Sequence, residues 1–149
     1  MSCLTSSLWE NTKHLYSILI HNAPIQEGVE IPIFVIDWEQ AQLGVPALDH
    51  GEMIGELYAF WLYKKIDAGL WMMQGYAEGL GEQSETSVWR NAIQLGVHLL
   101  AFSTIAGWGT PDQIEDVVQL ARDIIVNGWD KNREWFEKSE LACLFAQVA

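Results

Sequence analysis

A helical period that runs from Asp49 to the end of the chain constrains the fold more than any other feature. Apolar residues recur there every three or four positions, as they do when one face of a helix is buried. Asp49 and Glu52 have the form of an N-cap with a reciprocal acidic partner, so we expect the first helix to begin at Asp49. A shorter amphipathic helix is expected over residues 67–81.

Further start and stop signals divide the remaining chain into helices. Ser84 is suited to cap a long helix that the glycines from Gly107 onward would stop. Residues 110–113 read Thr-Pro-Asp-Gln, which offers a capping Thr, Pro at the first helical position and Gln three residues after the cap. Asn127-Gly128 is expected to break this helix, and a final helical stretch is expected over 130–147.

The N-terminal part predicts strands instead. Residues 16–20 and 31–36 are short runs of apolar residues, and a connection with Pro24 and Gly28 separates them. This pattern predicts a small β-hairpin, which is marginal in water by itself and should lie against helices. The predicted fold class is therefore mainly α: a helix bundle with a small β-hairpin.

Length, charge and cysteine content limit the classes of function. A chain of 149 residues suits one domain, and 20 acidic against 8 basic residues give a net charge of −12. Phosphate backbones and anionic membranes would be repelled, so we expect no nucleic acid and no membrane as partner. A cationic ligand or divalent metal remains reasonable. Cys3 and Cys143 are expected to be free thiols, and the absence of a signal-like N-terminus predicts a cytoplasmic protein.

One segment carries a recognisable chemical motif. The apolar strand that ends at Ile36 runs directly into Asp37-Trp38-Glu39, and a turn then leads to Asp49 at the predicted helix start. This arrangement presents a carboxylate at the lip of a cleft. The segment resembles the metal-binding segment of the aminoglycoside phosphotransferase and choline kinase-like family, particularly its fungal members.

Three more segments support the resemblance, which extends from about Ile18 to the C-terminus. They read Asp-His-Gly-Glu-Met-Ile-Gly-Glu-Leu-Tyr at 49–58, Leu-Gly-Val-His-Leu-Leu at 95–100 and Trp-Phe-Glu-Lys-Ser-Glu-Leu-Ala-Cys-Leu-Phe at 135–145. Their order and spacing are similar to the C-terminal lobe of these proteins. The resemblance implies that residues 1–149 form a single truncated lobe of this type, with a divergent segment at 1–17. It also implies that Asp37 corresponds to an Asp that binds magnesium, so weak Mg²⁺ binding at Asp37 is the only cofactor that we consider.

The family's catalytic segment is not recognisable here. That segment reads His-Gly-Asp, about four residues, and then Asn before an apolar strand. Alignment of that strand with residues 18–20 places Glu10-Asn11-Thr12 at His-Gly-Asp and Ser17 at the metal-binding Asn. Thr12 cannot accept a proton near neutral pH as a carboxylate does. No Gly-rich loop or nucleotide-anchoring Lys precedes it, so we expect a pseudoenzyme without kinase activity.

The candidate ligand-binding residues are those expected around the old substrate cleft: Trp38, Glu39, Asp49 and Trp61. Alternatives remain for two acidic residues. Backbone N–H groups could satisfy Asp37 in the turn after the strand, and Asp49 is better explained as a helix cap than as a ligand. The first functional hypothesis is a truncated, kinase-inactive domain that binds a small molecule or a protein partner in this cleft. An apolar surface rich in Trp also favours a homodimer.

His50 supports a different hypothesis, because an imidazole beside Asp37 could act as a general acid or base near pH 7. Under this alternative, the domain is a cyclase, isomerase or dehydratase, for example of fungal secondary metabolism, and His50 and Asp37 are catalytic. An ordinary surface histidine is the simpler interpretation of His50. His98, on an apolar helix, is expected to be buried and structural. A structural subunit and a fragment of a longer kinase-like protein also remain open.

Overall fold

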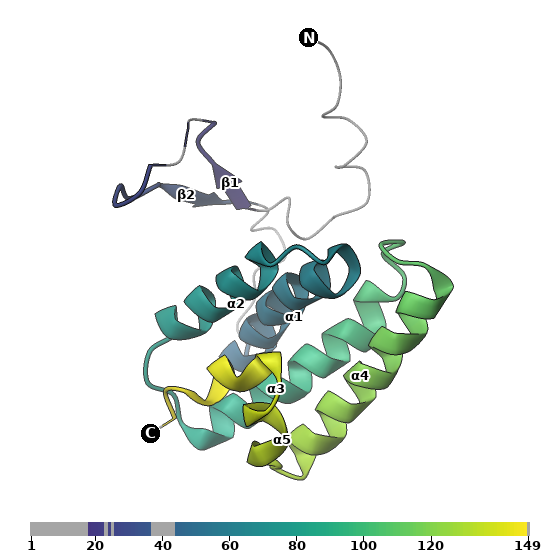
Figure 1. Cartoon of the computed structure of the whole chain (residues 1–149). Helices are drawn as coiled ribbons and strands as arrows, with labels where there is room; N and C mark the ends of the chain where they lie inside the picture. The colour runs from purple at the N-terminus through teal and green to yellow at the C-terminus, as the bar shows by residue number, and fades with distance from the viewer. Residues whose placement is uncertain (1–17, 23, 25, 37–43, 149) are drawn as a thin grey trace. The chain divides into compact units, whose positions relative to one another are not determined.

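The computed structural model describes residues 18–22, 24, 26–36 and 44–148. The chain divides into two compact units, Met1–Leu43 and Gly44–Ala149, and each is described by itself (Figure 1). In the first unit, β1 (Ile18–Ile20) pairs with β2 (Ile33–Val35) in antiparallel register, so that Leu19 lies opposite Phe34. The predicted hairpin is confirmed.

The second unit begins with α1 (Pro46–Lys64), which starts earlier than the sequence predicted. Val45 is the N-cap residue and makes no side-chain capping bond, while Pro46 occupies the first turn, where its fixed φ suits a helix. Asp49 lies inside the first turn, so the prediction that it caps the helix is wrong. The helix ends at Lys64, and the C-cap residue Lys65 is left-handed, with a φ of 55°.

The next helices follow their predicted starts closely. α2 spans Ala68–Gly79, and α3 spans Glu85–His98. The Ser87 backbone N–H donates to Ser84 Oγ at 3.2 Å, which confirms Ser84 as a cap. Beyond His98 the helix does not continue regularly to Gly107 but forms a π-helical turn, η3 (Leu99–Ser103).

α4 (Pro111–Trp129) confirms the capping box, because Gln113 N–H donates to Thr110 Oγ1 and Thr110 N–H donates to Gln113 Oε1. The predicted break at Asn127-Gly128 is wrong: the helix runs through Gly128, where a Cβ would lie only 3.0 Å from Ile93 Cγ1. Gly128 therefore serves close packing on α3. The C-terminal stretch forms a short α5 (Arg133–Glu137) and a 3-10 helix, η4 (Glu140–Phe145), instead of one helix.

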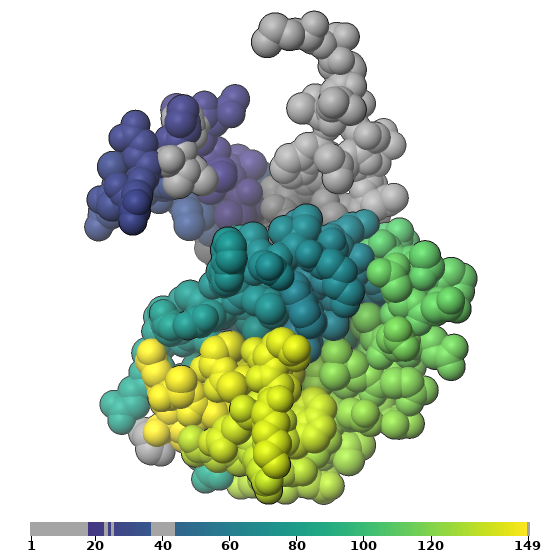
Figure 2. Space-filling view, viewed as in Figure 1, coloured from purple at the N-terminus to yellow at the C-terminus, as the bar shows by residue number. Residues whose placement is uncertain are grey.

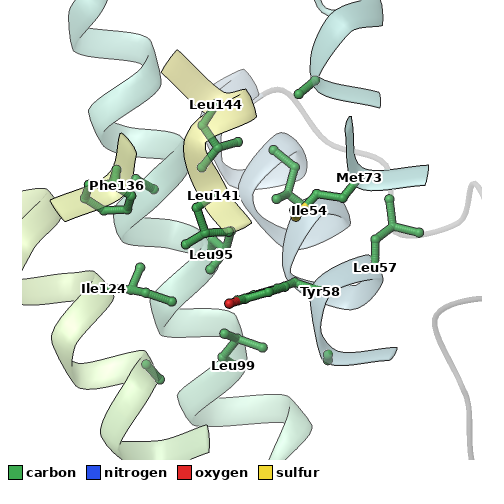
Figure 3. Packing of buried hydrophobic residues seen from close by; sticks show 14 of the residues in the cluster. Ile54, Leu57, Tyr58, Met73, Leu95, Leu99, Ile124, Phe136, Leu141 and Leu144 are labelled. Carbon is green, nitrogen blue, oxygen red and sulfur yellow. The ribbon is translucent and has the colours of Figure 1, made fainter. Parts of the chain in front are cut away.

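The helices enclose a single apolar cluster in which α3 contacts both α1 and α4. Figure 3 shows side chains of α1, α2, α3, α4 and the C-terminal segment meeting there. The C-terminal segment, yellow in Figure 2, lies beside α2 and covers that side of the apolar cluster. Large side chains that are almost fully buried include Ile54, Tyr58, Met73, Leu95, Leu99, Ile124, Phe136 and Leu141. The predicted mainly α fold with a small hairpin is confirmed.

Two glycines allow α1 to approach α3 closely. A Cβ on Gly51 would lie 2.5 Å from Gln94 Cβ, and one on Gly55 would lie 2.9 Å from His98 Cδ2. Both distances are too short for a side chain, so this helix pair depends on the small residues. Among the helices that the structure describes, none has the length and apolar character needed to cross a bilayer.

Candidate functional site

His50, near the start of α1, contacts helix α2. His50 Nδ1 lies 2.9 Å from the Tyr76 hydroxyl oxygen, and the two rings meet edge to face. Both side chains are half-buried. Burial, and to a smaller extent the negative charge of Asp49, raises the pKa of Tyr76. The phenol therefore remains protonated at neutral pH and can donate to Nδ1, which leaves the proton of a neutral His50 on Nε2.

We refer to Asp49, His50 and Tyr76 as the α1–α2 cluster. Asp49 is exposed and contributes a carboxylate that attracts cations. A neutral imidazole whose tautomer is fixed by a neighbouring phenol can donate a hydrogen bond to a ligand or exchange a proton with it. The cluster thus offers one negative charge and one imidazole that can donate or accept a hydrogen bond.

The structure brings together only part of the predicted site. Asp37, Trp38 and Glu39 lie outside the described residues, so their predicted roles remain predictions. Trp61 lies twelve residues after Asp49 on α1, about 18 Å along the helix. Its ring stacks on Tyr58, with 5.6 Å between centroids, and Lys65 Nζ lies 4.8 Å from its centroid. Trp61 therefore does not belong to the α1–α2 cluster.

Sequence reasoning missed Tyr76 as a functional residue. It lies within the amphipathic helix expected over residues 67–81, and nothing in the sequence pairs it with His50, which lies 26 positions away. The sequence signal for Tyr76 is its hydroxyl group, because a half-buried phenol usually has a hydrogen-bonding partner; the sequence does not say which residue that partner is.

A second polar pair lies inside the core. His98 Nε2 is 2.7 Å from Glu56 Oε1, and the two residues are 1% and 6% exposed. The His98 ring stacks on Phe102, with 5.1 Å between centroids. This confirms the prediction that His98 is buried and structural. Because both residues are buried between α1 and α3, a ligand cannot reach them from the surface.

The structure does not describe Asp37, the residue predicted to bind magnesium. Among the residues that it describes, no three His, Cys, Asp or Glu side chains gather as a metal site would require. Any chemistry of the α1–α2 cluster therefore depends on the carboxylate of Asp49, the imidazole of His50 and the phenol of Tyr76.

Comparison with known proteins identifies fungal phosphotransferases as relatives. The chain is 35% identical over 130 residues to a protein named phosphotransferase FrzJ from Cladobotryum sp, which covers 87% of this chain and 34% of that protein. It is 24% and 22% identical to 4-hydroxytryptamine kinases from Psilocybe cubensis and Psilocybe cyanescens, over 54% and 68% of this chain. These matches confirm the resemblance to fungal kinase-like phosphotransferases.

The chain spans about a third or less of the length of these relatives, with coverage of 34%, 23% and 28%. No protein-family model matches the chain. No solved structure matches it either.

Proposed function

We propose that this chain is a phosphotransferase-like domain that binds a small hydroxylated amine through the α1–α2 cluster and does not itself transfer phosphate. The observation that carries the proposal is the 2.9 Å contact between His50 and Tyr76 beside the carboxylate of Asp49. Asp49 would attract the ammonium group of such a ligand, and His50 Nε2 would hydrogen-bond to its hydroxyl oxygen.

The names of the relatives support this class of ligand. Two of them are named as kinases of 4-hydroxytryptamine, a molecule that carries both an amine and an aromatic hydroxyl. A net charge of −12 favours a cationic ligand over an anionic one. The proposed absence of phosphate transfer is supported by the alignment given above, which places Glu-Asn-Thr at residues 10–12 where the family has His-Gly-Asp and leaves no carboxylate at the position of the base.

Calorimetry with 4-hydroxytryptamine tests binding, and γ-labelled ATP with magnesium tests transfer. We expect saturable binding of the amine that weakens about tenfold in Asp49→Asn, equivalent to about 1.4 kcal/mol. Asp112→Asn is the matched control, because Asp112 occupies the first turn of α4 and its loss removes the same charge. Binding that is equal in both variants, or labelled product from any acceptor, would contradict the proposal.

A second candidate function is an acid–base enzyme of another class, in which His50 moves the proton and Tyr76 holds its ring. The hydrogen bond between these two residues favours it, since a phenol that fixes the orientation of an imidazole leaves the other ring nitrogen to exchange a proton with a ligand. Mass spectrometry of the same amine incubated without nucleotide provides the test. A product that disappears in His50→Gln would support this candidate, and an unchanged ligand would argue against it for this substrate.

A further inference from the structure

A groove on the other side of α1 has a chemistry of its own. It has a volume of about 350 Å³ and is lined by Val45, Ala47, Leu48, Arg90, Ile93 and Gln94. We call it the Arg90 groove. Four of its six lining residues are apolar and two, Arg90 and Gln94, are polar. An apolar pocket with a few polar groups, at the lower end of the ~300–1,000 Å³ typical of ligand sites, is suited to a small molecule.

The groove is separate from the α1–α2 cluster. Leu48 and His50 are two residues apart on α1, so their side chains point about 160° apart around the helix axis. His50 contacts Tyr76 of α2, whereas Leu48 lines the groove together with residues of α3. A ligand in one place would not touch the other.

Arg90 is the unusual member of the groove. The other arginines that the structure describes each pair with a carboxylate on their own helix, Arg122 with Asp123 and Arg133 with Glu137. Arg90 is exposed, and none of the described residues gives it a hydrogen bond or an ion pair. Its planar guanidinium therefore remains available, and its geometry matches the two oxygens of a carboxylate.

None of the residues that the structure describes covers the apolar wall of the groove. Val45 is 46% exposed and Leu48 is 51% exposed, although both line the groove. A ligand that covered them would gain about 25 cal/mol for each Å² of apolar surface removed from water. The guanidinium at one end and the apolar wall beside it thus complement a molecule with an anionic head and an apolar body.

The charge of the chain narrows the choice of anion. The net charge of −12 opposes every anion, so only the local positive charge of Arg90 favours one here, and a doubly charged phosphate is repelled more strongly than a singly charged carboxylate. Among the described residues that line the groove, Arg90 is the only cationic one, and it can neutralise one negative charge. We propose that the Arg90 groove binds a small carboxylate that carries one aromatic ring or a short alkyl chain.

Phenylacetate is a suitable probe, and ¹⁵N–¹H shift titration of the whole chain reports where it binds. We expect saturable shifts at the backbone amides of Val45, Ala47, Leu48 and residues 90–94; Pro46 has no amide proton. The dissociation constant should rise at least tenfold in Arg90→Gln. It should rise less in Arg90→Lys, which keeps the charge but loses the planar guanidinium that can form two parallel hydrogen bonds to a carboxylate. Arg122→Gln removes the same charge from α4 and should bind as the wild type does.

Two ligand controls separate the contributions. Acetate lacks the apolar body and 2-phenylethanol lacks the charge, so each should bind at least tenfold more weakly than phenylacetate. Equal affinity in Arg90→Gln and the wild type, or shifts that never saturate, would overturn the proposal. Shifts of the same amides that depend on protein concentration alone would overturn it as well, because a second copy of the chain would then occupy the groove. Since no amine is used, failure here leaves the proposed function intact.

Discussion

At the residue scale, the buried Glu56–His98 pair is a strong constraint on the core. A carboxylate and an imidazole leave water at a considerable cost, which their 2.7 Å hydrogen bond must offset. Within the described residues, Glu56 Oε2 has no hydrogen-bond partner of its own. The pair is therefore expected to fix how α1 lies on α3 more than to add net stability.

Replacement of one member should consequently cost more than replacement of both. We expect Glu56→Leu and His98→Leu each to lower the free energy of unfolding by about 3 kcal/mol, because the remaining polar group stays buried without its partner. The double variant should recover part of this loss. Urea unfolding measures all three, with Glu137→Leu as a control on the exposed Arg133–Glu137 pair, where less than about 1 kcal/mol is expected. Additive losses in the double variant would argue against this interpretation.

Single residues also show how far the sequence could define the site. Burial of His98 could be predicted, because it lies within an apolar helical run. The sequence also drew attention to His50. Its partner Tyr76 could not be found, since the contact depends on how α2 packs on α1. Trp61 was predicted at the cleft from its residue type, and that prediction stays open; its ring contacts Tyr58 and Lys65, two contacts within its own helix segment that residue type alone does not indicate.

At the element scale, predicted helix ends were right where the signal is local. Ser84 and the capping box at Thr110 act through bonds to residues three positions away, so the sequence contains all that they need. The predicted end at Gly128 was wrong because packing against Ile93 decides that position. The prediction at Asp49 failed because Pro46 provides an earlier start.

Two glycines in helices should respond to alanine in opposite ways. At Gly96 of α3, a Cβ would lie 2.7 Å from Ile125 Cγ1 and 2.9 Å from the Ala121 carbonyl oxygen, so Gly96→Ala should push α3 and α4 apart. We expect it to destabilise the fold by about 1–3 kcal/mol. Gly75 of α2 has nothing within 4 Å of the added Cβ, and Gly75→Ala should stabilise by up to about 1 kcal/mol. Thermal unfolding of both variants provides the test, and shifts of equal sign would contradict it.

At the scale of the whole molecule, the entire buried apolar cluster belongs to the unit that begins at Gly44. Its last members, Phe136, Leu141, Leu144 and Phe145, come from α5 and η4. The sequence predicted a helix bundle and a hairpin, but it did not predict how the C-terminal stretch splits, because α5 and η4 are shaped by the core they cover.

A fragment of residues 44–149 should therefore fold without the preceding residues. We expect cooperative urea unfolding and a helical circular dichroism spectrum. A fragment of residues 44–132, which lacks α5 and η4, should lose cooperativity because four buried apolar side chains are removed. A non-cooperative transition in the longer fragment would show that the core depends on residues 1–43.

The π-helical turn at Leu99–Ser103 has a consequence for variation in chain length. His98 and Ser103 are both buried although five positions separate them, a spacing that would point them about 140° apart on a regular α-helix. The turn accommodates one surplus residue between them. Deletion of exposed Ala101 would restore ordinary α-helical spacing with both side chains still facing inward, whereas an insertion would put them out of phase. We therefore expect the interior of the bundle to tolerate the loss of a residue at this turn better than the gain of one.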